Sequence, residues 1–218
     1  MPRKNLYRST VLPYHITARV NNREIFPLPL DRMWKVISFE TWHMSLIFGL
    51  EVHVLVIMPN HVHMIATVPE FDLGIVMNQW MSNITKATNA LSGKSGHLFG
   101  GPYYWSIIES SRYFGHALKY VYRNPVKAGL CARVEQYPHS TLHGLLGFAY
   151  LPVPIFYSRS ALEFHLPTPG SVPWLEWLNQ PFSKEVDELI GKGLKRKFFK
   201  QYKDEKTKKI FRDLEIIQ

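Results

Sequence analysis

The most constraining feature of the sequence is the apolar run from Val52 to Val68, VHVLVIMPNHVHMIATV, which contains His61 and His63. Side chains alternate between the two faces of a strand, so residues two apart point the same way, about 7 Å apart at roughly 3.3 Å per residue. Such a pair can bind one metal ion, although half-buried histidines with ordinary hydrogen bonds show the same pattern. Pro59 and Asn60 predict a break between two strands, because proline cannot donate a hydrogen bond within a sheet.

The length and composition indicate a folded protein rather than a disordered or membrane-spanning one. The 218 residues suffice for one domain with an extension, and 46% of them are hydrophobic. No apolar run reaches the roughly 20 residues that a membrane span requires. The N-terminal residues show no secretory signal, and the single cysteine, Cys131, excludes an internal disulfide. We therefore expect a protein of the reducing cytoplasm with no membrane partner.

The formal net charge of +9 favours a polyanionic partner. Lysine and arginine bind phosphates with release of counterions, which makes nucleic acid the first candidate. Many basic proteins bind nothing anionic, so the charge alone does not identify the ligand.

The hydrophobic patterns predict strands and helices in the order β-α-β-β-α-β, followed by a further helix. This order is typical of an α+β fold with a ferredoxin-like antiparallel sheet and helices packed on one face. The predicted elements are a strand at Leu12–Val20, a helix at Leu30–Leu50 with Asp31 as its N-cap, two strands within Val52–Val68, a helix at Asp72–Leu91, a strand at Tyr103–Glu109 and a helix at Ser111–Arg123 that ends before Pro125.

The character of the chain changes near residue 150, where we place a domain boundary. Six prolines between residues 151 and 182 predict an extended connector without packed secondary structure. Residues 183–218 form a basic and helical tail in which lysines and arginines alternate with Phe198, Phe199 and Tyr202. Such a tail could contact phosphates and bases, or it could be an amphipathic helix that packs on residues 1–150.

Two motifs resemble those of the HUH single-tyrosine transposases, a family that includes the REP-associated tyrosine transposases. They are IMPNHVHMI around the two histidines and, some sixty residues later, KYVYRNPVKAGL. YHITARVNNREIF, GHLFGG and YPHSTLHGLLG extend the resemblance from about Tyr14 to Gly147. The chain departs from many relatives at GPYYWS, where aromatic residues stand in place of a basic one.

The resemblance implies a metal-dependent nuclease that cuts single-stranded DNA, keeps the 5′ phosphate on a tyrosine and rejoins strands. His61 and His63 match the metal-binding histidines of the family, and Tyr120 matches its nucleophile. Asn124 lies one helical turn after Tyr120, so its amide oxygen could be a third ligand for Mg²⁺ or Mn²⁺. The implied substrate is a DNA hairpin or palindrome with a flanking single strand, and both a monomer and a homodimer fit the sequence.

Other residues are weaker candidates for the site. Tyr122 points away from Tyr120 on a helix, Tyr113 lies further upstream, and His15 is either structural or a ligand. An exposed Tyr103, Tyr104 or Trp105 could stack on a base. Candidate phosphate contacts, each of which could equally be a solvated surface residue, are Arg19, Arg23, Lys86, Lys94 and Lys119. No spacing favours a role for His97, His139 or His143.

Two other classes of function are compatible with the same residues. One is a nucleic-acid-binding module that keeps the fold without cleavage, although such a module has no need of a phenol beside a histidine pair. The other is a metal-dependent phosphodiesterase that activates water, in which Tyr120 is structural. A covalent bond between protein and DNA distinguishes the transposase from both.

Overall fold

An antiparallel sheet with helices on both faces forms the centre of the computed structural model, which describes residues 8–156 and 167–199. The strands lie in the order β2-β3-β1-β4-β5, with β5 parallel to β4 and all other pairs antiparallel. The first four strands have the order of a ferredoxin-like sheet, which confirms the predicted fold class. The strands are β1 (Tyr14–Arg19), β2 (Glu51–Met58), β3 (His61–Thr67), β4 (Tyr104–Ile108) and β5 (Phe198–Phe199).

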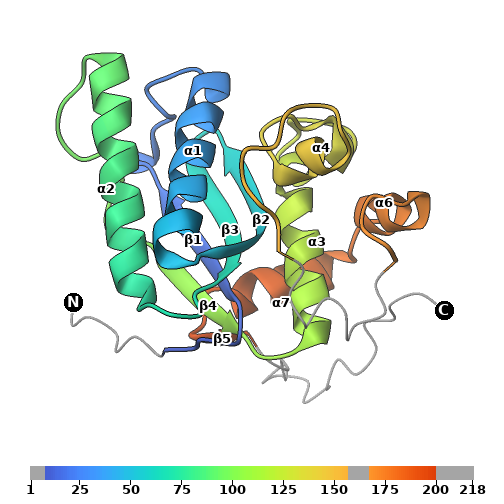
Figure 1. Cartoon of the computed structure of the whole chain (residues 1–218). Coiled ribbons are helices and arrows are strands. Elements are labelled where there is room, and N and C mark those ends of the chain that lie inside the picture. The colour runs from blue at the N-terminus through green and yellow to red at the C-terminus, as the bar shows by residue number, and fades with distance from the viewer. Residues whose placement is uncertain (1–7, 157–166, 200–218) are drawn as a thin grey trace.

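The first face of the sheet is covered by α1 (Leu30–Phe48) and α2 (Leu73–Ser92), which lie side by side in Figure 1. Asp72, predicted as the first residue of this helix, is the N-cap of α2 and accepts a hydrogen bond from the Gly74 N–H, whereas the N-cap of α1 is Pro29 rather than the predicted Asp31. Buried side chains of both helices, such as Ile37 and Trp80, pack against this face and form one of the two hydrophobic cores.

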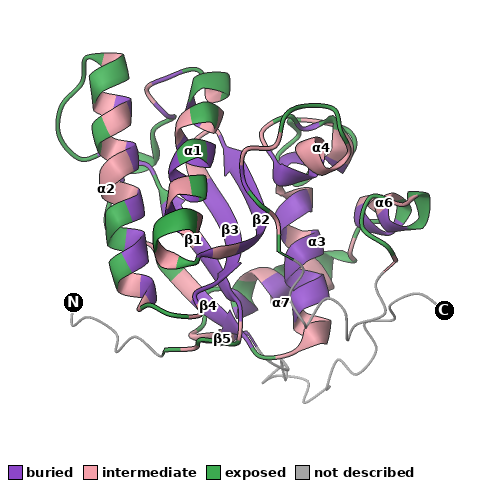
Figure 2. Cartoon of the chain, viewed as in Figure 1, coloured by how far each residue is buried: buried purple, intermediate pink, exposed green. Residues whose placement is uncertain are grey.

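The second face is covered by α3 (Ser111–Lys127), α4 (Thr141–Leu145), α6 (Val172–Asn179) and α7 (Lys184–Gly193). Two short 3₁₀ turns complete the described elements, η1 (Asn21–Arg23) and η2 (Val134–Gln136). A second core lies between α3 and the sheet, and Figure 2 shows the buried strands enclosed between the two helical layers. The sequence predicts helices on one face only, so this second layer is a finding of the structure.

Helix α3 continues through Pro125, contrary to the prediction that it ends before this residue. Proline cannot donate to the carbonyl four residues earlier, which here belongs to Val121. The Asn124 side chain compensates, because its Nδ2 donates to the Tyr120 carbonyl at 3.1 Å and lies 3.5 Å from the Val121 carbonyl. The helix therefore carries Tyr120, Asn124 and Lys127 on one continuous surface.

The segment after residue 150 is more ordered than the prediction of an extended connector allows. Leu151–Phe156 does run extended, and the Phe156 N–H donates to the Val52 carbonyl of β2 at 2.8 Å. Val172–Asn179, in contrast, form α6, which begins at the N-cap Ser171 and buries Trp174 against the second core. The prediction of an extended connector was wrong here because Pro173 lies in the first turn of α6, where proline costs no helical hydrogen bond.

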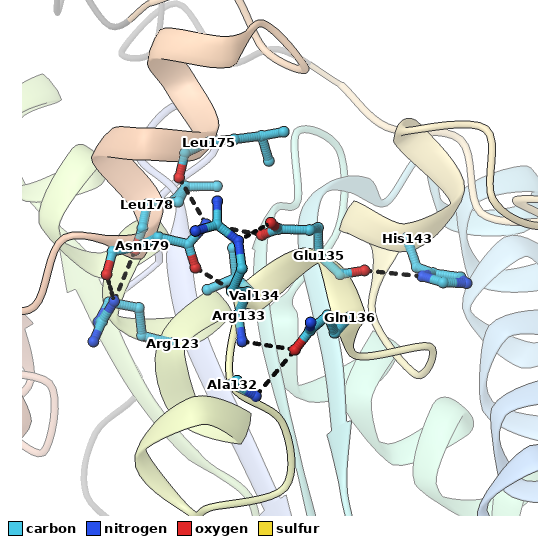
Figure 3. A network of polar contacts seen from close by, with 10 residues as sticks. All are labelled: Arg123, Ala132, Arg133, Val134, Glu135, Gln136, His143, Leu175, Leu178 and Asn179. Atoms are coloured by element: carbon cyan, nitrogen blue, oxygen red, sulfur yellow. Dashed lines mark hydrogen bonds and ion pairs between the residues drawn. The ribbon is translucent and has the colours of Figure 1, made fainter.

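A polar network joins α6 to the segment after α3, as Figure 3 shows. The Arg123 guanidinium donates to the Leu178 and Asn179 carbonyls at the end of α6. Asn179 in turn accepts from the Val134 N–H at 3.0 Å and donates to the Glu135 carboxylate at 2.8 Å. These contacts hold α6 against η2 and α3. The proposed boundary near residue 150 stays a prediction, and most of the basic tail, residues 200–218, lies outside the described residues.

Candidate active site

The pairing of β1 with β3 gathers the candidate ligands on the sheet face that α3 covers. In this register Thr17 lies opposite His63, Arg19 lies opposite His61, and His15 is diagonal to His63. Residues directly opposite one another in an antiparallel pair project from the same face. The predicted break is the two-residue turn Pro59–Asn60, which places His61 first in β3.

The rings of His61 and His63 face each other with their Nε2 atoms. Their Nε2 atoms are 3.1 Å apart, and the rings are nearly perpendicular. Two imidazole nitrogens that bind one ion at about 2.1 Å lie roughly 3 Å apart when they subtend a right angle. The donor pair therefore fits a divalent metal ion. Among residues 8–156 and 167–199, no group of three or more His, Cys, Asp or Glu side chains is arranged to hold one.

The two imidazoles are held neutral by their surroundings. Burial, and to a smaller extent the nearby charge of Arg19, lowers the pKa of His61 to about 4. Burial also holds the pKa of His63 well below its usual range, with added repulsion from His15, His61 and Arg19. Neutral imidazole is the form that binds metals. Arg19 is exposed and lies across from His61, so it could also contact a phosphate there.

Tyr120, on α3, lies beside His63. The two ring centroids are 6.5 Å apart in an edge-to-face arrangement. Burial raises the pKa of the Tyr120 hydroxyl; Lys127 opposes this effect and Asp187 adds to it. The phenol is therefore protonated at neutral pH, and it must lose its proton when the oxygen attacks another atom.

Helix α7 packs against the side of Tyr120 that faces away from His63. The Lys127 ammonium lies 5.5 Å from the centre of the Tyr120 ring and forms an ion pair with Asp187 of α7. A Cβ atom placed on Gly191 would lie only 3.2 Å from the Tyr120 hydroxyl oxygen, so the backbone of α7 approaches this oxygen closely. The C-terminal segment thus contributes directly to the surroundings of the candidate nucleophile.

The Asn124 side chain is oriented by the backbone of α3. Its Nδ2 donates to carbonyls of its own helix, so the amide oxygen Oδ1 must point the other way. No hydrogen bond within the described part of the chain uses Oδ1, which leaves it available as a ligand. The side-chain hydrogen bonds of Asn124 among the described residues go to its own helix and not to His61 or His63, so its predicted role as third ligand stays a prediction.

The weaker candidates for the site make other contacts or lie on the surface. The Tyr122 hydroxyl is buried and lies 3.1 Å from the Thr141 hydroxyl, and Tyr113 packs on Phe199. Lys119 is buried beneath the Trp177 and Phe182 rings, and burial lowers its pKa to about 8. His139 contacts Asp31, and the His143 ring contacts the Glu135 carbonyl. Besides Arg19, the candidates Arg23, Lys86, Lys94 and His97 are exposed.

Tyr104 is the aromatic residue of the GPYYWS segment that the structure exposes. Its exposed fraction is 70%, whereas Tyr103 and Trp105 are half-buried. Tyr104 pairs with Thr17 of β1, which itself pairs with His63 of β3. The three residues thus lie in one row across the sheet and project from the same face. An aromatic surface is therefore available on the face that carries the histidine pair.

Sequence reasoning missed three residues of the site. Asn60, which we read only as a turn residue, contacts His61 with its Oδ1 at 2.6 Å from the ring Nδ1. Its position next to His61 was a usable signal. Lys127 follows Tyr120 by seven residues, two helical turns, which also could have been recognised. Asp187 could not, because its contact with Lys127 depends on how α7 packs.

Comparison with known proteins finds similarity both in sequence and in fold. No family model matches the chain. The REP-associated tyrosine transposase of Escherichia coli K12 is 32% identical over 94 residues, which are 43% of this chain and 54% of that protein. The chain therefore spans about half the length of this curated relative.

A solved structure of the REP-associated tyrosine transposase bound to a REP hairpin superposes with a TM-score of 0.59 and 21% identity, and the match covers 72% of this chain and 96% of that one. A putative transposase from Deinococcus radiodurans gives a TM-score of 0.38 at 15% identity over 53% of this chain and 92% of that one, too low to indicate a shared fold.

The fold of this chain is therefore similar to that of a solved tyrosine transposase. The resemblance predicted from the sequence is confirmed, since this protein is similar to the REP-associated tyrosine transposases in sequence over part of its length and in its fold. Among the described helices, none combines the length and apolarity needed to traverse a bilayer.

The lowered pKa values predict that the stability of the metal-free protein falls between pH 7 and pH 5. The unfolded chain binds protons at an ordinary histidine pKa near 6.5, whereas folded His61 does so only near 4. The stabilisation is therefore complete above pH 6.5 and is lost progressively as the pH falls toward 4. In chelator, we expect the wild type to lose about 2–4 kcal/mol more unfolding free energy over this range than a His61→Gln/His63→Gln double variant. Urea denaturation at several pH values measures this, and parallel pH profiles would contradict it.

Proposed function

We propose that this protein is a metal-dependent single-stranded DNA nuclease and transposase that acts through a covalent phosphotyrosine at Tyr120. The proposal rests on one observation above all, that Tyr120 of α3 lies edge-on to His63, whose Nε2 faces the Nε2 of His61. A phenol beside a neutral imidazole pair suits phosphoryl transfer to tyrosine. The similarity to a transposase of E. coli supports the same chemistry.

The proposed metal is Mg²⁺ or Mn²⁺, bound by His61 and His63 and by the amide oxygen of Asn124. When bound, it would neutralise charge on the scissile phosphate. The residues of the chain then have separate tasks. The histidines provide neutral donors at a fixed separation, and Arg19 offers a positive charge directly opposite His61 on the neighbouring strand.

Cleavage in this scheme exchanges one phosphate ester for another. The Tyr120 oxygen attacks phosphorus and releases its proton, while the bond from phosphorus to the 3′ oxygen breaks and that oxygen takes up a proton. The downstream fragment of the cleaved strand stays attached to Tyr120 through its 5′ phosphate, and the upstream fragment keeps a free 3′-hydroxyl. A second 3′-hydroxyl can attack the phosphotyrosine, which rejoins the strands and restores the phenol without an external energy source.

The substrate we infer is a DNA hairpin with a flanking single strand. The similar solved structure holds a REP hairpin, and the net charge of +9 suits a polyanion. The proximity of His63 and Tyr120 within one chain supports a site that is assembled in cis. A homodimer is compatible with this arrangement but is not needed for it.

The test of the proposed function is covalent attachment of DNA to the full-length protein. We expect Mn²⁺-dependent transfer of a 3′-end label, but not a 5′-end label, to a band of protein size on a denaturing gel. Tyr120→Phe should reduce this transfer by roughly 10⁴-fold or more, because the nucleophile is gone. Tyr122→Phe, the same change on the same helix, should retain it.

Two outcomes would contradict the proposal. Cleavage of the hairpin without a covalent product would indicate a phosphodiesterase that activates water. Binding without cleavage, over substrates drawn from both flanks of the gene, would indicate a nucleic-acid-binding module.

Tyr104 provides a second prediction, about how the DNA is held. Stacking of one base on an aromatic side chain contributes about 1–3 kcal/mol. We therefore expect Tyr104→Ala to weaken binding of a hairpin with a single-stranded flank by about 5- to 100-fold, measured by fluorescence anisotropy in chelator. Tyr150→Ala is the matched control, since Tyr150 has an exposed fraction of 86% and lies outside the sheet. Equal affinities for the two variants would refute a stacking role.

A further inference from the structure

The histidine pair of the proposed metal site is itself held by two other side chains. His61 Nδ1 is 2.6 Å from Asn60 Oδ1, and His63 Nδ1 is 3.0 Å from His15 Nε2. Each imidazole thus turns its Nδ1 to one partner and its Nε2 to the other imidazole. In metal sites, a partner on the second ring nitrogen fixes both the tautomer and the orientation of the ring.

The contact of Asn60 determines the tautomer of His61. Asn60 Nδ2 donates to the Arg23 carbonyl at 3.2 Å, so the amide cannot be turned round and Oδ1 must face His61. Because Oδ1 only accepts, the proton of His61 must be on Nδ1. Its Nε2 therefore carries a lone pair, as a metal ligand requires.

The backbone around this contact is built to hold it. Val20 N–H donates to the Asn60 carbonyl and Phe26 N–H to the Pro59 carbonyl, both at 2.9 Å, so the segment after β1 fastens the β2–β3 turn. Arg23, whose carbonyl accepts the hydrogen bond from Asn60 Nδ2, has a φ of 61°. This left-handed conformation is rare for arginine. Such strain is retained where surrounding contacts impose it, often near functional sites.

His15 contacts the Nδ1 atom of His63, as Asn60 contacts the Nδ1 atom of His61. It is 2% exposed, its ring stacks on the His63 ring with centroids 5.3 Å apart, and its Nε2 points at Nδ1 rather than at Nε2 of His63. This direction explains why the three histidines do not converge on one point. Burial lowers the pKa of His15 to about 4, so its ring is neutral and carries one proton, and the backbone of Leu194, just after α7, opposes this shift. His15 Nδ1 has no hydrogen-bond partner among the described residues. With the ring proton on Nδ1, His15 Nε2 accepts a hydrogen bond from His63 Nδ1.

We propose that Asn60 and His15 are positioning residues that fix His61 and His63 as Nδ1–H tautomers, so that both Nε2 lone pairs face one divalent cation. The inference rests on the proposed metal-dependent function and adds residues that act through the ligands. His15 is thus a partner of a ligand, which resolves the two roles that the sequence left open for it.

Binding of Mn²⁺ without DNA tests the role of His15 apart from catalysis. His15→Gln keeps an acceptor at about the position of Nε2, whereas His15→Leu removes it. We expect His15→Leu to weaken Mn²⁺ binding by about 10- to 100-fold, and His15→Gln to stay within about threefold of the wild type. The readout is the free Mn²⁺ signal in electron paramagnetic resonance titrations of the full chain. Thr17→Val, on the same face of the same strand, is the control and should match the wild type.

Several results would overturn the proposal. Unchanged affinity in His15→Leu, or equal losses in His15→Leu and His15→Gln, would contradict positioning by hydrogen bonding while leaving the proposed function intact. A wild-type protein that binds no Mn²⁺ would overturn both proposals. If His15→Leu does not fold, ¹⁵N spectra of the wild-type imidazoles loaded with Zn²⁺ decide the matter. They should show protons on Nδ1 of both His61 and His63, and a proton on Nε2 of either ring would refute the assignment.

Discussion

The antiparallel pairing of β1 with β3 is the constraint on which the site depends. A slip of one residue would turn His61 and His63 into the first core and bring Val62 to the other face. The observed register keeps His15, Arg19 and both histidines on the face covered by α3. The turn at Pro59–Asn60 is fastened by the segment after β1, which protects this register at the end where the histidines lie.

The second helical layer converts this arrangement of donors into a candidate active site. Helix α3 brings Tyr120 against His63, and α6 and α7 hold α3 in place through Arg123, Asn179 and the Lys127–Asp187 ion pair. The same layer keeps water from the histidine pair, which accounts for the lowered pKa values of both rings. Donor geometry and neutral charge therefore have a common origin in the packing of this layer on the sheet.

Local pattern was enough to predict the first half of the fold. Alternation around His61 and His63, the proline turn and the helical spacing of α2 each depend on neighbouring residues, so sequence spacing reveals them. The continuation of α3 through Pro125 was not predictable from helix rules, because it relies on Asn124 bonding back to its own helix. Trp174, Asp187 and Gly191 were missed for another reason, since their contacts join segments far apart in the chain. In the same way, the residue that His15 faces follows from strand register rather than from sequence spacing.

The central claim is that one side chain of α3, placed by its packing on the histidine pair, receives the DNA phosphate. Tandem mass spectrometry tests it directly. Full-length protein is incubated with a hairpin substrate and Mn²⁺, and the product is digested with nuclease and protease. The account predicts a nucleotide phosphate on the peptide that contains Tyr120, localised to that side chain. A phosphate on Tyr113, on Tyr122 or on any residue outside α3 would contradict it.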